Sequence, residues 1–372
     1  MRILILGTAY PHRGGIAHYN ALLYKHLSKN NEVRLISFKR QYPKIFFPGK
    51  TQEESGEAEI KVTAEPLMDS INPLNWIKVG LVARSWNADL IIFKYWLPFF
   101  APCFGVITAI AKLFRNTKAL IVCDNVIPHE RRIGDKIFTR FAFSFANYFI
   151  VQSDTVENEL LDFKPNAVYK KIPHPVYEIF GEKLSKAEAK NELKIKNEKV
   201  ILFFGYIRKY KGVHDLIDAM KIFCQSSDAH LLIVGEYYDD ENSYREQVRK
   251  LNLSEKISIV SDYVPSSEVA KYFSACDVVV LPYIDATQSG IIQIAYNFDK
   301  PVIATSVGGL KEVIVDNYSG LLVPPNNPNE LANAMKKFYD ENLEEKLSFG
   351  ASQEKIKYSW SAMTDGILEL VK

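Results

Sequence analysis

Four turns of this 372-residue sequence combine glycine with small polar or basic residues, a composition that suits the binding of an anion. The first, Thr8–Asn20, contains Gly14, Gly15 and Ile16 and opens a predicted helix directly after a short apolar run. Glycine lets backbone N–H groups come close to a ligand, and a helix N-terminus adds partial positive charge. An ordinary strand-to-helix turn has the same composition, so this segment alone leaves both interpretations open.

The second turn follows a predicted buried strand that ends at Gly205, and it presents Tyr206, Arg208 and Lys211 before the next helix. Arginine offers a planar fork of donors and lysine a compact charge, a pair that suits a pyrophosphate. Open α/β sheets bind ligands at the carboxyl ends of their strands. The placement therefore favours a binding site over a solvated basic turn.

The third turn places small polar residues at the start of a predicted helix, in the run Thr287-Gln288-Ser289-Gly290. Such a run is an anion site or a simple N-cap. The fourth turn, Thr305–Leu310, follows another predicted strand. Because parallel strands end at one edge of a sheet, we expect the last three turns to lie at the same edge, which favours a shared anionic ligand.

Several other chemistries are excluded by their missing motifs. The chain has no G-x-G for a dinucleotide, no G-x-S-x-G for a serine nucleophile and no D-x-D pair for a metal bound to a nucleotide. The sequence therefore predicts a metal-independent site that relies on cations and helix N-termini.

Short apolar runs alternate with amphipathic segments along the whole chain, the pattern of parallel β-α units. The predicted strands are Ile3–Leu6, Val33–Phe38, Leu90–Phe93, Ala119–Val122, Phe149–Val151, Val200–Phe204, Leu231–Val234, Ile257–Val260, Val278–Leu281 and Val302–Ala304. The predicted helices are Ala17–Ser28, Asp135–Ala146, Val213–Phe223, Ser243–Leu251, Ser267–Phe273, Ile291–Asn297 and Pro328–Tyr339. The acidic stretch Glu53–Glu65 is predicted to be a solvated loop or insertion.

The pattern predicts an α/β protein with two Rossmann-like, doubly wound domains that face each other across a cleft. A proline-bracketed segment at residues 173–175 suggests a boundary, with domains at 1–174 and 175–356. A last helix, at about 357–372, is predicted to pack against either domain, the first included.

Composition limits the function classes further. The chain is 47% apolar, and its 46 basic and 44 acidic residues give a net charge of +2, which argues against a nucleic-acid-binding polycation. The net charge is basic in the first 174 residues and acidic in the rest. Four scattered cysteines form neither a disulfide framework nor a zinc motif, so we expect a cytoplasmic protein.

The motifs of the second half resemble the retaining glycosyltransferase family 4, which has the GT-B fold. They are F-x-G-x-x-x-x-x-K-G, D-V-V-V-L-P, P-V-I-A-T-x-V-G-G-L-x-E-x-I and G-L-L-V-P-P. The resemblance implies transfer of a sugar from a nucleotide-diphosphate donor, held by the second domain, to an acceptor held by the first. It implies a glycan or lipid-linked saccharide acceptor, a role in surface polysaccharide or glycolipid biosynthesis, UDP rather than GDP, no further cofactor and no nucleic acid.

The resemblance also implies roles for single residues. Lys211 matches the diphosphate-binding lysine of the family, and Arg208 substitutes for an arginine whose usual position is Tyr206 here. The glycine loop Gly14–Ile16 would place amides against the donor phosphates. The paired glutamates of the family are missing, and a T-Q-S-G run, which resembles one branch of the family, would hold the donor at Thr287–Gly290 instead.

Two catalytic candidates follow the predicted strand Ala119–Val122. Many members of the family have a histidine there, where this chain has Cys123 and Asp124. We predict that Asp124 and His129 act near the reacting sugar, although His129 could equally be a loop residue that caps the next helix. The resemblance implies attack by the acceptor hydroxyl on the face that the diphosphate leaves, with the diphosphate accepting the proton. The alternatives are a nucleotide-sugar epimerase of the GT-B fold and an inactive nucleotide-sugar-binding partner.

A second surface is predicted in the first half. Three cations recur every four residues, as on one helical face: Arg132, Lys136 and Arg140. Phenylalanines at positions 138, 141 and 145 form another face, and Tyr95–Ala111 contains no charge but includes two prolines. One interpretation is peripheral contact with an anionic membrane, and the other is a solvated basic face over a packed apolar one.

Overall fold

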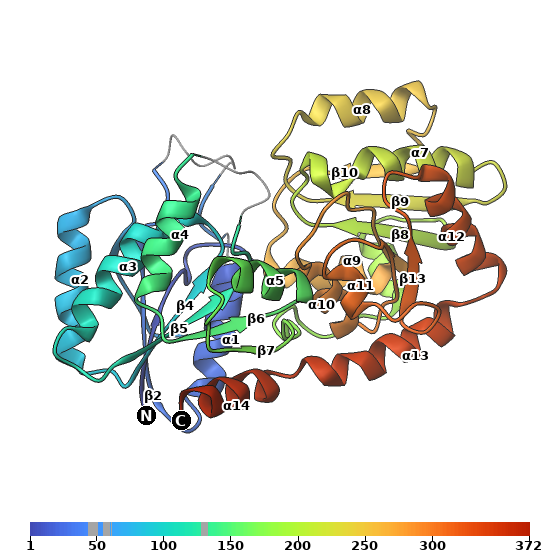
Figure 1. Ribbon diagram of the computed structural model, residues 1–372. Helices are drawn as coiled ribbons and strands as arrows, with labels where there is room; N and C mark the ends of the chain where they lie inside the picture. Colours follow the sequence, from blue (N-terminus) through green and yellow to red (C-terminus); the bar gives the residue numbers. More distant parts are fainter. Residues whose placement is uncertain (44–50, 55–59, 61, 128–132) are drawn as a thin grey trace. The chain divides into compact units, whose positions relative to one another are not determined.

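The computed structural model describes residues 1–43, 51–54, 60, 62–127 and 133–372 and divides into two compact units. Unit 1 consists of Met1–Pro175 and Trp360–Lys372, and unit 2 of Val176–Ser359. Each unit is built on one parallel sheet flanked by helices, as Figure 1 shows. The predicted α/β class with two Rossmann-like domains is confirmed.

Within the described residues of unit 1, the strands pair in the order β3-β2-β1-β4-β5-β6-β7. The strands are β1 (Arg2–Leu6), β2 (Glu32–Arg40), β3 (Ala64–Asp69), β4 (Leu90–Tyr95), β5 (Lys118–Cys123), β6 (Tyr148–Val151) and β7 (Tyr169–Lys171). The helices are α1 (Gly15–Leu27), α2 (Pro73–Trp86), α3 (Ala101–Lys112), α4 (Asp135–Ser144), α5 (Asp154–Phe163) and α14 (Trp360–Val371).

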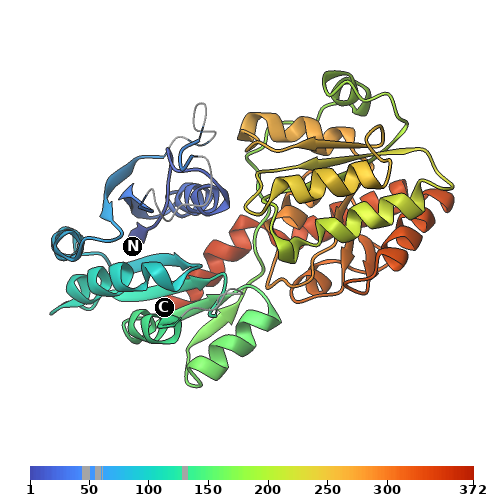
Figure 2. The same cartoon turned by 90° about the horizontal axis from the view of Figure 1, so that it is seen from above.

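The direction of the crossovers determines which face of this sheet each helix covers. Helix α1 connects β1 to β2, whereas α2, α3, α4 and α5 connect strands in the opposite direction along the sheet. Right-handed crossovers therefore place α2 to α5 on one face and α1 on the other. Helix α14 packs against α1, and the view from above shows this red C-terminal helix among the elements of unit 1 (Figure 2).

The sheet of unit 2 has the order β10-β9-β8-β11-β12-β13. Its strands are β8 (Lys199–Phe204), β9 (Ala229–Val234), β10 (Ile257–Val260), β11 (Val278–Leu281), β12 (Val302–Thr305) and β13 (Gly320–Val323). Its helices are α6 (Lys186–Glu192), α7 (Val213–Phe223), α8 (Glu241–Lys250), α9 (Ser266–Ala275), α10 (Gly290–Asn297), α11 (Leu310–Val313), α12 (Pro328–Asp340) and α13 (Glu344–Lys355).

The structure limits two expectations about unit 1. The predicted loop Glu53–Glu65 ends inside β3, because Glu65 lies in this edge strand and pairs with Arg34 of β2. The charge-free stretch Tyr95–Ala111 ends β4 and forms α3, whose Phe104 and Ile107 are fully buried. These side chains belong to the core, so they do not insert into a membrane. In the part of the chain that the structure describes, no helix combines the length and the apolar character that crossing a bilayer requires.

Candidate functional site

The predicted anion-binding turns of unit 2 follow three neighbouring strands. The turn with Arg208 and Lys211 follows β8, the run Thr287–Gly290 follows β11, and Gly308 lies in the turn after β12. Since β8, β11 and β12 are adjacent and parallel, all three turns lie at the carboxyl edge of one sheet. The structure thus brings together the predicted donor-binding residues of unit 2.

Glycines allow these turns to touch one another. Gly212 has a φ of 65°, and a Cβ there would lie 1.9 Å from the carbonyl oxygen of Pro282. Gly308 has a φ of 42°, and a Cβ there would lie 1.5 Å from the carbonyl oxygen of Ala286. Both contacts join a turn to the β11 turn, so larger residues would push apart the backbone that surrounds the site.

Lys211 is the cation with the most unusual surroundings. Its Nζ lies 3.6 Å from the ring centroid of Tyr283 and 5.2 Å from that of Tyr210. Among the described residues, no carboxylate pairs with this half-buried ammonium group. Burial, with a smaller contribution from the positive charge of Arg208, lowers the pKa of Lys211 to about 7. An anion bound beside these two cations would compensate both effects.

Aromatic rings extend this edge toward β9 and β10. The ring of Tyr206 lies 5.0 Å from that of Tyr238 and 6.5 Å from that of Tyr263, measured between centroids. The Arg208 guanidinium carbon lies 4.9 Å from the centroid of Tyr238. Sequence reasoning missed Tyr238 and Tyr263. Their position in the sequence could have indicated them, because each tyrosine lies just after a strand, as Tyr206 lies just after β8.

The T-Q-S-G run lies against two tyrosines, Tyr283 and Tyr177. Ser289 is the N-cap residue of α10, yet its side chain makes no capping hydrogen bond, and its Oγ lies 3.3 Å from the hydroxyl oxygen of Tyr283. Thr305 Oγ1 donates to the carbonyl oxygen of Tyr283 at 2.5 Å, which fixes this tyrosine beneath Lys211. Thr287 is buried, and a Cβ on Gly290 would lie 3.1 Å from Cε2 of Tyr177. Gln288 lies half-buried in the same turn.

The side chain of Gln293 is a further polar group in α10 that sequence reasoning missed. It is 1% exposed, and its Oε1 has no hydrogen-bond partner among the described residues. The sequence indicates a role for Gln293 only weakly, because one amide in an apolar helix is also typical of the polar side of an amphipathic helix.

In unit 1, the predicted glycine loop starts α1. Gly14 is the N-cap residue, with a φ of 99° and no side-chain capping bond, and Gly15 and Ile16 form the first turn. The carbonyl oxygen of Gly14 accepts from the N–H groups of Ala17 and His18. The loop therefore presents backbone rather than side chains at the carboxyl end of β1, as the sequence predicts.

Asp124 lies after β5 and forms an ion pair with Lys94 of β4, whose side chain is almost completely buried. The Lys94 Nζ also lies 3.4 Å from Gln152 Oε1 and 3.8 Å from the ring centroid of Tyr19. Burial lowers the pKa of Lys94, and Asp124 opposes this shift. Sequence reasoning missed Lys94, although a single lysine inside the apolar run of β4 was the available signal.

Histidine 174 lies near this pair. Its ring centroid is 5.3 Å from that of Tyr19, and burial, with a smaller effect of the Lys94 charge, lowers the pKa of His174 to about 3. The imidazole is therefore neutral near pH 7. The sequence named His174 only as part of the boundary segment.

Two predicted residues, His129 and Arg132, lie outside the described residues. Lys136 and Arg140 are exposed on α4. Among the residues that the structure describes, no three His, Cys, Asp or Glu side chains gather as a metal site would require.

Comparison with known proteins finds a family match in the second half of the chain. Residues 185–355 match the family model described as glycosyl transferases group 1. The whole chain is 25% identical to a protein named uncharacterized glycosyltransferase from Methanocaldococcus jannaschii, over 99% of this chain and 97% of that protein. A D-inositol 3-phosphate glycosyltransferase of Saccharomonospora viridis is 26% identical over 86% of this chain and 73% of its own length.

Solved structures decide the architecture. HepE from Anabaena, solved in complex with UDP-glucose, superposes with a TM-score of 0.76 at 19% identity, over 99% of this chain and 98% of that one. The chain has the GT-B fold. The family model lies wholly within unit 2 of this GT-B protein, the unit that contains Lys211 and the T-Q-S-G run. Membership of family 4, and of a T-Q-S-G branch, stays a prediction.

Proposed function

We propose that this GT-B protein is a metal-independent retaining glycosyltransferase that moves a sugar from a nucleotide-diphosphate donor to a glycan or lipid-linked saccharide. Its product would belong to surface polysaccharide or glycolipid biosynthesis in the cytoplasm. The four cysteines are free thiols, which fits that compartment.

One observation carries the proposal, namely the pair of cations in the turn after β8. Lys211 is half-buried without a carboxylate partner, and Arg208 is close enough to lower the pKa of Lys211. A diphosphate would supply the negative charge that Lys211 lacks and would offset the repulsion from Arg208. The turn lies inside the segment that matches the glycosyltransferase family model.

The tyrosine cluster supports a nucleotide as the carrier of that diphosphate. Tyr206, Tyr238 and Tyr263 lie beside Arg208, and their π-faces would stack on a base. HepE, a structural neighbour, was solved with UDP-glucose, which favours uridine over guanosine for this chain.

The proposed chemistry needs no protein nucleophile. The acceptor hydroxyl would attack on the face that the diphosphate leaves, and the departing diphosphate would accept the proton. Lys211, Arg208 and the N-terminus of α10 would stabilise the developing charge, which is the role a metal ion fills in other transferases. Asp124, held by Lys94, would orient the acceptor, together with His129.

The test compares nucleotide binding and transfer in three forms of the protein. Lys211→Ala removes the proposed diphosphate contact, and Lys209→Gln neutralises the exposed neighbouring lysine as a matched control. Removing one such charge-stabilising donor costs about 10²–10³ in kcat, so transfer from a UDP-sugar should nearly vanish in Lys211→Ala and persist in Lys209→Gln. UDP should raise the unfolding temperature of the wild type in proportion to its affinity, and that of Lys211→Ala much less.

Three results would contradict the proposal. A folded Lys211→Ala protein with near-wild-type turnover would remove the assigned site. Epimerised sugar in an incubation with donor alone would identify an epimerase. Tight UDP binding in calorimetry, with no transfer to any glycan or lipid-linked acceptor, would identify an inactive binding partner.

A further inference from the structure

We propose that unit 1 docks onto an anionic lipid bilayer through the outer face of the helix layer α2–α3–α4. This inference does not rest on the transferase reaction, because it comes from exposed side chains of unit 1, whereas Lys211 and Arg208 belong to unit 2. The sequence suggested a membrane contact at the cations and phenylalanines of α4 and at Tyr95–Ala111, and the structure adds the exposed stripe of α2.

Helix α2 has its apolar stripe on the solvent side. Leu74, Ile77 and Leu81 are spaced i, i+3 and i+7 and are 78%, 45% and 51% exposed. The opposite side of α2, with Val79 and Ala83, is buried in the core. A surface helix normally exposes polar residues on its outer side. Because α2 is apolar on its outer side as well as on its buried side, we infer that a partner covers the outer side.

Helix α3 packs directly against both α2 and α4. A Cβ on Gly80 of α2 would lie 2.8 Å from Cβ of Ile110, and one on Gly105 of α3 would lie 2.5 Å from Cε1 of Phe141. These close approaches pack the three helices side by side in one layer, as Figure 1 shows. The partly exposed residues of α3 are apolar except for Lys112 at its end, and they include Val106 and Ile110.

Helix α4 continues the apolar surface. Ile137 is 69% exposed, and the rings of Phe138 and Phe141 are about two-fifths exposed. Phe114, after α3, is 87% exposed and lies within 5.9 Å of the Arg84 guanidinium carbon. Since all three helices cover the same face of the sheet, their solvent sides point the same way.

The charges around this apolar face are almost all positive. Between residues 70 and 118 the single acidic residue is Asp89, against six lysines and arginines, of which Lys94 is buried and paired with Asp124; α4 adds Asp135 in its first turn. Lys78 of α2 and Lys136 and Arg140 of α4 are exposed beside the apolar stripes. Apolar side chains flanked by cations match the boundary between acyl chains and anionic headgroups. A second copy of the chain would instead bring like charges together in a symmetric contact.

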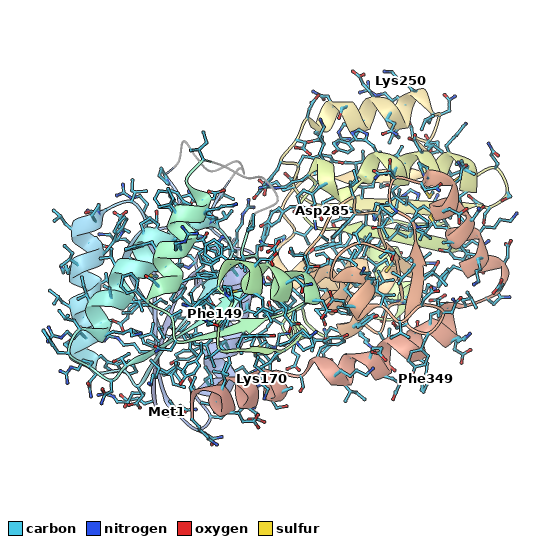
Figure 3. All side chains as sticks on the ribbon, in the orientation of Figure 1. Met1, Phe149, Lys170, Lys250, Asp285 and Phe349 are labelled. Atoms are coloured by element: carbon cyan, nitrogen blue, oxygen red, sulfur yellow. The ribbon has the colours of Figure 1, made fainter. Side chains whose placement is uncertain are left out.

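The experiment measures co-sedimentation of the full-length protein with vesicles of phosphatidylcholine alone or mixed with phosphatidylglycerol. The apolar variant is Leu74→Gln, Leu81→Gln and Ile137→Gln combined, and the charge variant is Lys78→Gln with Lys136→Gln. Phe349→Gln and Lys250→Gln are matched controls, because both residues are exposed on unit 2, where Figure 3 labels them.

The wild type should bind the anionic vesicles at low salt. It should dissociate from them at about 1 M salt, because the Debye length falls there to about 3 Å and the attraction between charges is screened. Each lost leucine should weaken partitioning about tenfold, and each lost lysine about fivefold. The controls should bind like the wild type, and all variants should keep the wild-type unfolding temperature and UDP affinity.

Three outcomes would overturn the proposal: no binding of the wild type to anionic vesicles, equal binding by the apolar variant, or equal binding to the two kinds of vesicle. A wild-type dimer in sedimentation velocity that the apolar variant dissolves, without vesicle binding, would make a second copy the partner instead. Because UDP binding is measured in parallel, failure here is separable from failure of the proposed transferase function.

Discussion

At the residue scale, Lys211 shows how a protein can prepare a site for an anion. The ammonium group lies against the ring of Tyr283, which it faces at 3.6 Å, and the described residues supply no carboxylate to neutralise it. A cation in such a place is costly when the site is empty and favourable when an anion fills it. Its pKa of about 7 in the ligand-free protein expresses that cost.

Nucleotide binding should therefore depend on pH. A diphosphate beside Lys211 raises its pKa, so the protonated form binds UDP more tightly, and affinity should fall as pH rises above about 7, at most tenfold per unit. The terminal phosphate, with a pKa of about 6, is already ionised in this range. Without a ligand, the unfolded chain binds the Lys211 proton more tightly than the folded protein does. The contribution of Lys211 to the free energy of unfolding should therefore rise between pH 7 and 10.5.

Calorimetry at about pH 8 in two buffers of different ionisation heat would count the protons taken up when UDP binds. We expect an uptake approaching one proton in the wild type and in Lys209→Gln, and none in Lys211→Met. A flat pH profile in the wild type, or an unchanged slope in Lys211→Met, would show that another group controls binding.

At the element scale, buried strands were the most predictable part of the molecule. The predicted run Leu90–Phe93 lacks only the last two residues of the observed β4. The run is easy to recognise because a central strand of a parallel sheet is apolar on both faces. The edge strand β3 was missed, since it contains Glu65 and Pro66 and makes register shifts with β2. The edge strand β7, of three residues, ends in two lysines and likewise has no apolar run.

Helix α3 and the exposed stripe of α2 mark a limit of sequence reasoning. Helix α3 is apolar all round, so periodicity could not distinguish a core helix from a membrane contact. The spacing of Leu74, Ile77 and Leu81 predicts one apolar face, but only packing shows that this face is outside. In the site, glycine turns at strand ends were visible from the sequence, whereas Lys94, Tyr238 and Tyr263 needed the topology.

The turn after β12 offers a test of how backbone geometry supports the site. Gly308→Ala puts a methyl group into a left-handed backbone position, 1.5 Å from the carbonyl oxygen of Ala286. The β11 turn must then move, and we expect a loss of about 1–3 kcal/mol in the free energy of unfolding together with weaker UDP binding. Ser306→Ala, two residues earlier at an exposed position, should change neither quantity.

Urea unfolding and UDP titration measure the two effects of Gly308→Ala separately. Wild-type stability with weakened UDP binding would still show that the turn positions the ligand. Wild-type values for both would contradict the role assigned to Gly308.

At the scale of the whole molecule, the chain passes between the units twice, after Pro175 and after Ser359. The last segment gives α14 to unit 1, where Trp360 is 1% exposed and lies 5.1 Å from Tyr19 and 5.6 Å from His26, between ring centroids. Tyr19 in turn lies against Lys94, the partner of Asp124. The C-terminal helix thus supports the α1 side of unit 1, including the buried ion pair.

Trp360→Ala should therefore destabilise unit 1 far more than unit 2. Removing a buried tryptophan costs about 3–5 kcal/mol, since the cavity beside Tyr19 and His26 would not be filled. In thermal unfolding we expect one transition to move to lower temperature, and UDP, whose proposed site lies in unit 2, to stabilise the other. Phe349→Ala on α13, where the ring is 61% exposed, should shift neither transition. A single transition that moves as a whole would instead mean that the two units unfold together, and an unshifted profile would mean that α14 adds little to the stability of unit 1.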